Sequence, residues 1–457
     1  MRKSSVDLTR GNIIKLVLMF ALPIFIGQVF QNLYNSVDAI VVGRYVGTTA
    51  LAAVSSCGNV AQLLIGFFVG LSAGAGVLFA HYFGAKRFES LETAIHTALT
   101  FSAALGVLMA AAGIVFTPWL LTLIRCPENV RAEAESYLRI YLVGILFTSV
   151  YNICAGVLRA VGDSRNPLKI LIVSSVVNIA LDLVLVAGLK MGVTGVALAT
   201  VFSQLISVII VLRMMLRSED VYHVEPGKLR VNGDELWKIL RLGMPSAVQA
   251  SLTSVSNLFV QRYINGFGSA AMAGIGTGQK IDRFSGLMGQ SIGLSSATFV
   301  SQNVGAGELD RTFRSIRVCL LLSLVISLAF AVPTYLLAAP LSGIFTRDPE
   351  ARRYAVDMIH VMLPFFFFNT LQQIFSGAVR GFGRSTSVMV MSLLGMVGCR
   401  QLYLALTLGM RHDIFYLYMS IPVGWISASL LVMAEYLIRI RIPQMRAGSP
   451  DLMSDSS

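Results

Sequence analysis

Long apolar stretches separated by short polar segments make up nearly the whole chain. Residues 16–37, 191–212, 242–261 and 318–346 contain no Asp, Glu, Lys or Arg. Each stretch supplies the roughly 20 residues that a helix needs to cross a bilayer, and none alternates as a barrel strand would. We therefore predict twelve spanning helices, at 13–40, 51–82, 92–121, 134–160, 167–189, 192–216, 236–264, 269–303, 312–339, 352–381, 385–409 and 414–438.

The composition agrees with a lipid environment. Hydrophobic residues make up 55% of the 457 residues and charged residues only 13%, whereas about a quarter of a soluble domain is charged. The first apolar stretch is longer than the core of a cleaved signal peptide, and further spans follow it. The five cysteines lack metal-ligand spacing, so we expect them to be small hydrophobic residues rather than metal ligands or disulfides.

The net charge of +12 reflects topology rather than a nucleic-acid partner. If the N-terminus is cytoplasmic, most of the 36 lysines and arginines fall on cytoplasmic segments or inner helix ends. Cytoplasmic loops of membrane proteins carry this excess. We expect a multi-pass protein of the plasma membrane with both termini in the cytoplasm, lipid around it and no nucleic acid bound.

The chain contains two copies of one pattern. Residues 159–162 align with 380–383, and residues 83–85 align with 304–306. Because each copy has an even number of spans, the copies form parallel repeats, and we expect them to face a central cavity as in transporters. The predicted fold is an all-α membrane protein with an N-terminal six-helix lobe (1–216), a cytoplasmic linker loop (217–235), a C-terminal six-helix lobe (236–440) and a disordered cytoplasmic tail (441–457).

Two acidic residues lie inside predicted spans of the first copy only. Asp38 lies in the first span and Asp182 in the fifth, where the second copy has residues near Phe259 and Tyr403. A charge at the bilayer centre costs about 2.5–3.5 kcal/mol on insertion scales, whereas a hydrogen bond between membrane helices contributes only about 0.6 kcal/mol. Carboxylates are therefore costly if they only join helices. Asp38 lies late in its span, so a position near the outer interface also fits.

The two acids suggest a cation site. Two carboxylates in apolar surroundings cannot both stay ionised easily, so the pair could take up a proton or share Na+ with neutral oxygens. The predicted ligands are Asp38, Asn178, Asp182 and Thr200; Asn178 precedes Asp182 by one helical turn and shares its face. Pro23 weakens the first span, and we expect the span to bend there when the cation binds.

Polar residues follow helical spacing in several spans of the first copy. Such stripes also join helices without binding a ligand, but their number predicts a wetted interior. The residues expected to line a substrate cavity are Gln31, Asn35, Tyr137, Asn152 and Gln204. We find no His, Ser or metal constellation at one depth, so we expect no enzyme activity and no cofactor other than the coupling ion.

Further charges lie in spans of the second copy. Lys280, Asp282 and Arg283 lie in the eighth span and form either a second site or, as we favour, an internally paired cluster near the outer third. Arg400 lies in the eleventh span. It could extend to the interface, pair with an acid or bind an anionic group of a substrate.

Three segments carry a resemblance to a known family. Residues 35–43, 156–163 and 301–306 are similar to signatures of the multidrug and toxic compound extrusion (MATE) family, and the resemblance covers roughly residues 10–440. It implies a two-lobed, twelve-helix bacterial exporter, expected to be monomeric, that uses alternating access to exchange H+ or Na+ for amphipathic, cationic drugs. It also places the cation site on Asp38, Asn178, Asp182 and Thr200.

The acids fit the DinF-like branch of this family, which carries them in the first lobe. The branch with carboxylates in spans 7 and 10 fits less well, because span 7 has no acid here and span 10 has only Asp357. A lipid-linked saccharide flippase of the same superfamily would need several basic residues in its cavity, and only Lys280, Arg283 and Arg400 are available. A non-transporting scaffold would not need two matched halves.

Overall fold

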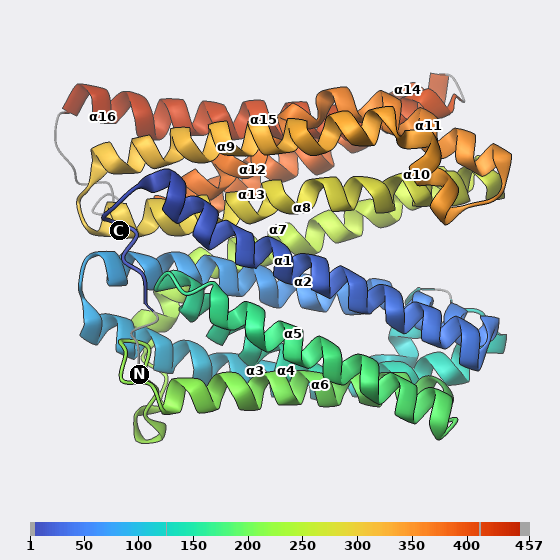
Figure 1. Ribbon diagram of the computed structural model, residues 1–457, viewed down its shortest axis with the longest axis horizontal. Coiled ribbons are helices and arrows are strands. Elements are labelled where there is room, and N and C mark those ends of the chain that lie inside the picture. The colour runs from blue at the N-terminus through green and yellow to red at the C-terminus, as the bar shows by residue number, and fades with distance from the viewer. Residues whose placement is uncertain (1–4, 125, 411–412, 448–457) are drawn as a thin grey trace. The chain divides into compact units, whose positions relative to one another are not determined.

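The computed structural model describes residues 5–124, 126–410 and 413–447, and within these ranges it contains helices, turns and loops but no strand (Figure 1). The prediction of an all-α fold is confirmed. Helices separated by turns form the six segments of the first copy: α1 (Ile13–Val41) with η1 (Val42–Val46), α2 (Thr48–Gly84), α3 (Phe88–Leu123), α4 (Glu128–Ala160), α5 (Arg165–Asp182) with η2 (Leu183–Gly188), and α6 (Gly192–Leu216).

The second copy has six corresponding segments. They are α7 (Gly233–Asn265), α8 (Ser269–Gly305), α9 (Leu309–Leu336), α11 (Pro349–Met362) with η4 (Leu363–Phe365) and α12 (Phe366–Gly381), α13 (Ser385–Leu393) with η5 (Leu394–Cys399) and α14 (Arg400–Met410), and α15 (Ile414–Tyr436) with η6 (Leu437–Arg441) and α16 (Ile442–Ala447). Ten of the twelve segments are long and apolar enough to cross a membrane by themselves. The other two, α7 and α8, have 33 and 37 residues but more polar sequences.

The chain divides into two compact units, one comprising residues 1–7 and 26–247 and the other residues 8–25 and 248–457. These units differ from the predicted lobes in two places: the first part of α1 belongs to the second unit, and residues 217–247, predicted as the linker and the start of the second lobe, belong to the first unit. Phe20 of α1 packs edge-on against Phe299 of α8, with ring centroids 6.4 Å apart, and both side chains are buried. The boundary therefore falls inside α1, two residues after Pro23.

The backbone repeats between the two copies. Short turns require left-handed φ angles at equivalent places: 118° at Gly47 and 90° at Gly268, and 85° at Gly162 and 79° at Gly383. Glycine adopts these angles without a steric penalty. A third equivalent pair is Lys86, at 56°, and Gly307, at 74°.

Close helix packing repeats as well. Gly156 of α4 lies against Ser72 of α2, and at the equivalent place Gly377 of α12 lies against the backbone of Gly293 of α8. Small residues let helix backbones approach closely, which is how membrane helices gain van der Waals contact. Both copies therefore use the same helix pairing, as the sequence repeat predicts.

Three local features differ from the predicted spans. The tenth span is interrupted by the single turn η4, which contains Pro364, because proline cannot donate the helical hydrogen bond. A short helix, α10 (Ala338–Phe345), follows α9. Residues 442–447 of the predicted disordered tail form α16, whereas residues 448–457 lie outside the described part of the chain.

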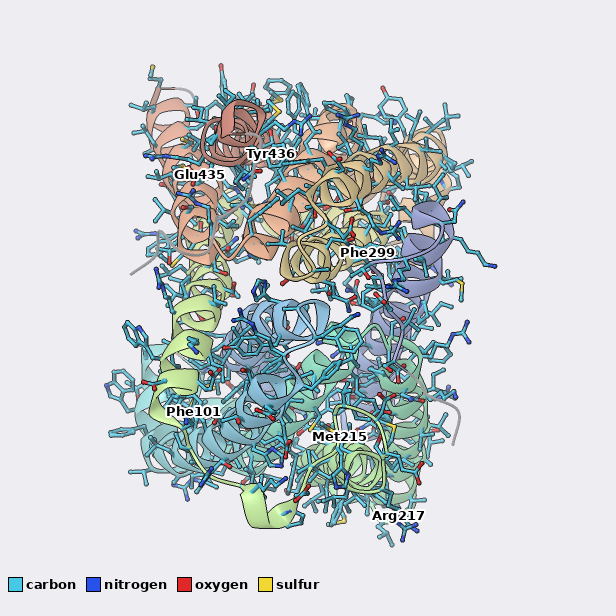
Figure 2. All side chains as sticks on the ribbon, turned by 90° about the vertical axis from the view of Figure 1, so that its left-hand side faces the viewer. Phe101, Met215, Arg217, Phe299, Glu435 and Tyr436 are labelled. Atoms are coloured by element: carbon cyan, nitrogen blue, oxygen red, sulfur yellow. The ribbon has the colours of Figure 1, made fainter. Side chains whose placement is uncertain are left out.

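The predicted linker packs onto the first unit. Tyr222 and Val224 are 4% and 3% exposed and join a core cluster with residues of α2, α3, α4 and α6, among them Met215 (Figure 2). The backbone N–H of Glu225 donates to Nε2 of His96 on α3, at 3.0 Å. The linker is thus fixed to one unit, up to the start of α7 at Gly233.

Candidate functional site

Two helices bring Asp38 and Asp182 together in the first unit. Asp38 lies on α1 and Asp182 is the last residue of α5, and their carboxyl groups lie within hydrogen-bonding reach of each other. Helix α5 begins where Asp163 accepts hydrogen bonds from the backbone N–H groups of Arg165, at 3.1 Å, and Asn166, at 3.0 Å. Such side-chain caps satisfy the free donors at a helix start.

Asp182 and the neighbouring Asn178 are buried, Asp38 is half-buried, and most of their polar atoms have no hydrogen-bond partner within the described residues. Asp182 is 0% exposed and Asn178 is 1% exposed. Within the described residues, Oδ1 of Asp38, both carboxylate oxygens of Asp182 and both amide atoms of Asn178 lack a protein partner. Buried polar groups are normally paired, and a buried unpaired charge is costly. Two carboxylates accept but cannot donate, so a hydrogen bond between them requires a proton.

Three tyrosines lie near the acids. The rings of Tyr137 and Tyr141 on α4 are stacked, with centroids 5.7 Å apart and planes inclined by 21°. Both tyrosines, and Tyr34 of α1, lie close enough to Asp38 to interact with it electrostatically. Tyr34 is not among the predicted site residues, although it precedes Asp38 by one helical turn and so shares its face.

The other predicted cation ligand, Thr200, is buried on α6, which packs along α5 (Figure 1). Its hydroxyl donates to the carbonyl of Val196 in the same helix, at 3.0 Å. The donated proton leaves the hydroxyl oxygen with lone pairs that can accept or coordinate.

The predicted cavity residues are in different environments. Tyr137 is buried beside Asp38. Gln204 is half-buried, and its Oε1 atom has no partner within the described residues. Asn152 donates to the carbonyl of Thr148, at 2.8 Å. Gln31 is exposed and reaches the Tyr34 hydroxyl, and Asn35 is exposed. These last two residues therefore lie beside the buried pair rather than within it.

A π-helical turn follows each acid. Segment η1 starts at Val42, one turn after Asp38, and η2 starts directly after Asp182. The two π-helical segments contact each other. Single π-helical turns are rare and occur frequently at functional sites. No residue pattern in the sequence marks them.

The charged residues in the spans of the second unit do not form a pair like that of Asp38 and Asp182 within the described residues. The predicted internal pairing of Lys280, Asp282 and Arg283 is not seen as an ion pair among the described residues: Lys280 and Arg283 are exposed, and Oδ1 of Asp282 is buried without a hydrogen-bond partner. Arg400 donates to Asn257 and Ser420.

Side chains that commonly bind metal ions are dispersed in the described part of the chain. Among the described residues no group of three or more His, Cys, Asp and Glu side chains could hold a metal ion. All five cysteines are free; four are buried and Cys399 is exposed. The Asp38–Asp182 pair is too small a cluster for this kind of metal centre, so a bound Na+ would depend on neutral oxygens such as those of Asn178 and Thr200.

Comparison with known proteins agrees with the repeat and the fold. The MatE family model matches residues 23–184 and again residues 245–403. The chain is 32% identical to the probable multidrug resistance protein YoeA of Bacillus subtilis (strain 168) over 389 residues, which is 83% of this chain and 84% of that protein.

Solved transporter structures have the same fold. A MOP superfamily transporter from Pyrococcus furiosus matches with a TM-score of 0.88 and 22% identity, over 98% of this chain and 99% of the other. An outward-facing multidrug resistance MATE family transporter matches with a TM-score of 0.87 and 22% identity, over 96% and 99%. The twelve-span fold, the two matched segments and the similarity to YoeA together show that the chain belongs to the MatE family of membrane transporters.

Proposed function

We propose that this protein is a multidrug-efflux antiporter that exports amphipathic compounds in exchange for H+ or Na+. One observation carries this proposal: the carboxyl groups of Asp38 and Asp182 are neighbours, and Oδ1 of Asp38 and both oxygens of Asp182 are buried without a hydrogen-bond donor within the described residues. A structural pair would be expected to have a cationic or hydrogen-bonding partner. A pair that lacks one is suited to receiving a cation from outside.

Cation binding changes the energetics of the site. A proton shared by the two carboxyl groups, or Na+ bound by them with Asn178 and Thr200, removes the repulsion between two negative charges. Release of the cation restores it. Because Asp38 and Asp182 lie on different helices, this repulsion acts between α1 and α5. We propose that the cycle of attraction and repulsion bends α1 near Pro23, where a helical hydrogen bond is missing, and so drives alternating access.

The energy source is the cation gradient. A membrane potential of 100 mV supplies about 2.3 kcal/mol per elementary charge moved, which corresponds to a concentration ratio of nearly fifty. We propose that both termini lie in the cytoplasm, which the distribution of lysine and arginine supports. In this proposal the chain spans the plasma membrane, and the cation site lies in its first unit.

We propose that the substrates are amphipathic and that Gln31, Asn35, Tyr137, Asn152 and Gln204 line their path on the first unit. The similarity to the probable multidrug resistance protein YoeA supports drugs as substrates. The lipid-linked saccharide flippase is less well supported, because Lys280 and Arg283 are exposed and Arg400 donates to the neutral Asn257 and Ser420 on other helices. The acids in the first unit support placement in the DinF-like branch.

The decisive experiment is dye efflux by Asp38→Asn and Asp182→Asn variants in proteoliposomes with imposed gradients. We expect each variant to lose at least nine-tenths of the efflux rate, because an amide cannot release a proton or neutralise Na+. Asp357→Asn is the matched control: this acid lies on α11, is 50% exposed and pairs with Arg353 at 3.7 Å. Efflux above half the wild-type rate in either first-unit variant would refute the mechanism.

The same vesicles distinguish the coupling ion. A pH gradient without Na+ drives efflux if the pair carries a proton, and a Na+ gradient at constant pH drives it if the pair binds sodium. Wild-type efflux that responds to neither gradient would contradict antiport altogether.

A further inference from the structure

The two copies place opposite charges in equivalent spans. In the first copy, Asn178 and Asp182 lie on α5; their equivalents in the second copy are Cys399 and Tyr403, and next to Cys399 is Arg400. Arg400 lies about ten residues, or roughly 15 Å, from the end of α14 at Met410. It is therefore placed well inside the span rather than at its end.

The guanidinium group of Arg400 has only neutral partners. Its Nη1 donates to Oδ1 of Asn257 on α7, at 3.2 Å, and its Nε donates to Oγ of Ser420 on α15, at 3.5 Å. No carboxylate of the described residues forms an ion pair with it. A guanidinium group has five N–H donors, so the bonds to Asn257 and Ser420 leave donors available for a ligand.

Neighbouring residues hold the Arg400 side chain in place. A methyl group added at Gly424 of α15 would lie 3.7 Å from Cβ and Cδ of Arg400, so the aliphatic stem packs along this glycine. The next residue, Gln401, donates to the hydroxyl of Ser256 on α7, at 3.0 Å, and to its carbonyl, at 3.1 Å. Helices α7, α14 and α15 of the second unit thus fix the position of the charge.

The local backbone gives a second reason to assign a role to Arg400. The π-helical segment η5 ends at Cys399, directly before Arg400. Asp38 and Asp182 adjoin η1 and η2 in the first unit. In both units, π-helical turns therefore adjoin charged residues inside spans, and such turns are often functional.

A permanently charged group inside a span requires compensation. Arginine binds carboxylates and phosphates with two parallel hydrogen bonds, which neutral amides and hydroxyls cannot replace. We propose that Arg400, oriented by Asn257 and Ser420, binds a carboxylate or phosphate group of the transported compound. The substrate class then includes amphipathic molecules that carry an anionic group, in addition to cations. This inference rests on the transport function proposed above.

The test compares two dyes that differ by one group: a rhodamine with a free carboxylate and its methyl ester. For Arg400→Gln we expect efflux of the carboxylate dye to fall at least tenfold and efflux of the ester to change less than twofold. Arg400→Lys retains the charge without the paired geometry, so its loss should be intermediate. Arg353→Gln, at an exposed position on α11, is the control and should leave both dyes unchanged. An equal effect on both dyes, or on neither, overturns the proposal.

Binding to purified protein separates this proposal from the antiport mechanism. Fluorescence polarisation of the carboxylate dye in neutral-lipid nanodiscs should show at least tenfold weaker binding to Arg400→Gln, even if wild-type vesicles transport nothing. Equal binding to wild type and variant overturns the proposal. Nanodiscs containing phosphatidylglycerol test whether a lipid phosphate can occupy Arg400. Dye binding that is present in neutral nanodiscs but lost in phosphatidylglycerol nanodiscs supports the anion site, because the lipid then competes with the dye. Dye binding that occurs only in phosphatidylglycerol nanodiscs overturns the proposal.

Discussion

Replacing Gly377 with alanine tests whether close backbone packing holds the second unit together. Gly377 of α12 lies against the backbone of Gly293 of α8; the new methyl group would collide with the Gly293 carbonyl oxygen and lie 3.3 Å from Cβ of Ser296. Because the obstacle is backbone, rotation of a side chain cannot relieve the collision. The two helices must move apart.

The size of the effect follows from two opposing terms. Overpacking in a tightly packed site costs about 1–3 kcal/mol, and a backbone collision belongs near the upper end. Alanine is better than glycine in a helix by about 1 kcal/mol, which offsets part of the cost. The net destabilisation is then about 2 kcal/mol. For a unit of roughly 200 residues, this lowers the melting temperature by about 4–8 °C.

The assay is size-exclusion chromatography of detergent-solubilised protein after heating, with Gly276→Ala as the control. Gly276 lies on α8 as well, but no atom lies within 4 Å of an added methyl group. Only the propensity term acts there, so the melting temperature should rise by about 2–4 °C. If Gly377→Ala were as stable as Gly276→Ala, the packing argument would be wrong.

Two further predictions concern polar contacts at the linker. Nζ of Lys228 lies 3.0 Å from Glu225 and holds the pKa of that carboxyl below its ordinary value of 4.5. The resulting stabilisation is fully present above pH 4.5 and is lost as the pH falls through the lower pKa of the folded state, so the melting temperatures of wild type and Lys228→Gln should converge as the pH is lowered below 4.5. A gap that widens on acidification would contradict this. Glu235 is 8% exposed and accepts hydrogen bonds from Tyr82 at 3.1 Å and Lys238 at 2.8 Å. Glu235→Leu should therefore lower the free energy of unfolding by about 1.5–3 kcal/mol, measured as loss of the monodisperse chromatography peak on heating. An unchanged heating profile would show that these contacts contribute nothing to stability.

Much of the architecture could be predicted because membrane-spanning helices can be recognised in the sequence as long apolar stretches without charged residues. The repeat was also visible, since glycines such as Gly162 and Gly383 are required by turn geometry in both copies. The acid pair could be predicted because placing an ionised carboxylate such as Asp38 or Asp182 inside the bilayer costs free energy. The structure places the two side chains together. Their role in cation binding remains a prediction.

Other features had no signal in the sequence. The π-helical turns depend on a single extra residue within an otherwise helical hydrogen-bond ladder, and ordinary helical residues can supply it. The boundary between units passes through α1 because Phe20 packs on Phe299, a contact between residues far apart in the chain. Tyr34 could not be singled out, because an aromatic residue in a span can face lipid or pack in the core, and the sequence does not show which neighbours it has.

The extra residue of η1 has a geometric consequence for α1. Successive α-helical residues are rotated by about 100° around the axis, so one inserted residue turns everything beyond Val42 to a new side. The helix face that carries Gln31, Tyr34 and Asp38 therefore ends at η1. The following residues Arg44 and Tyr45 point to other sides of the helix than continuous α-helical spacing would give. If the surplus residue migrated one turn toward the N-terminus, Asp38 itself would change sides without any change in the length of the span.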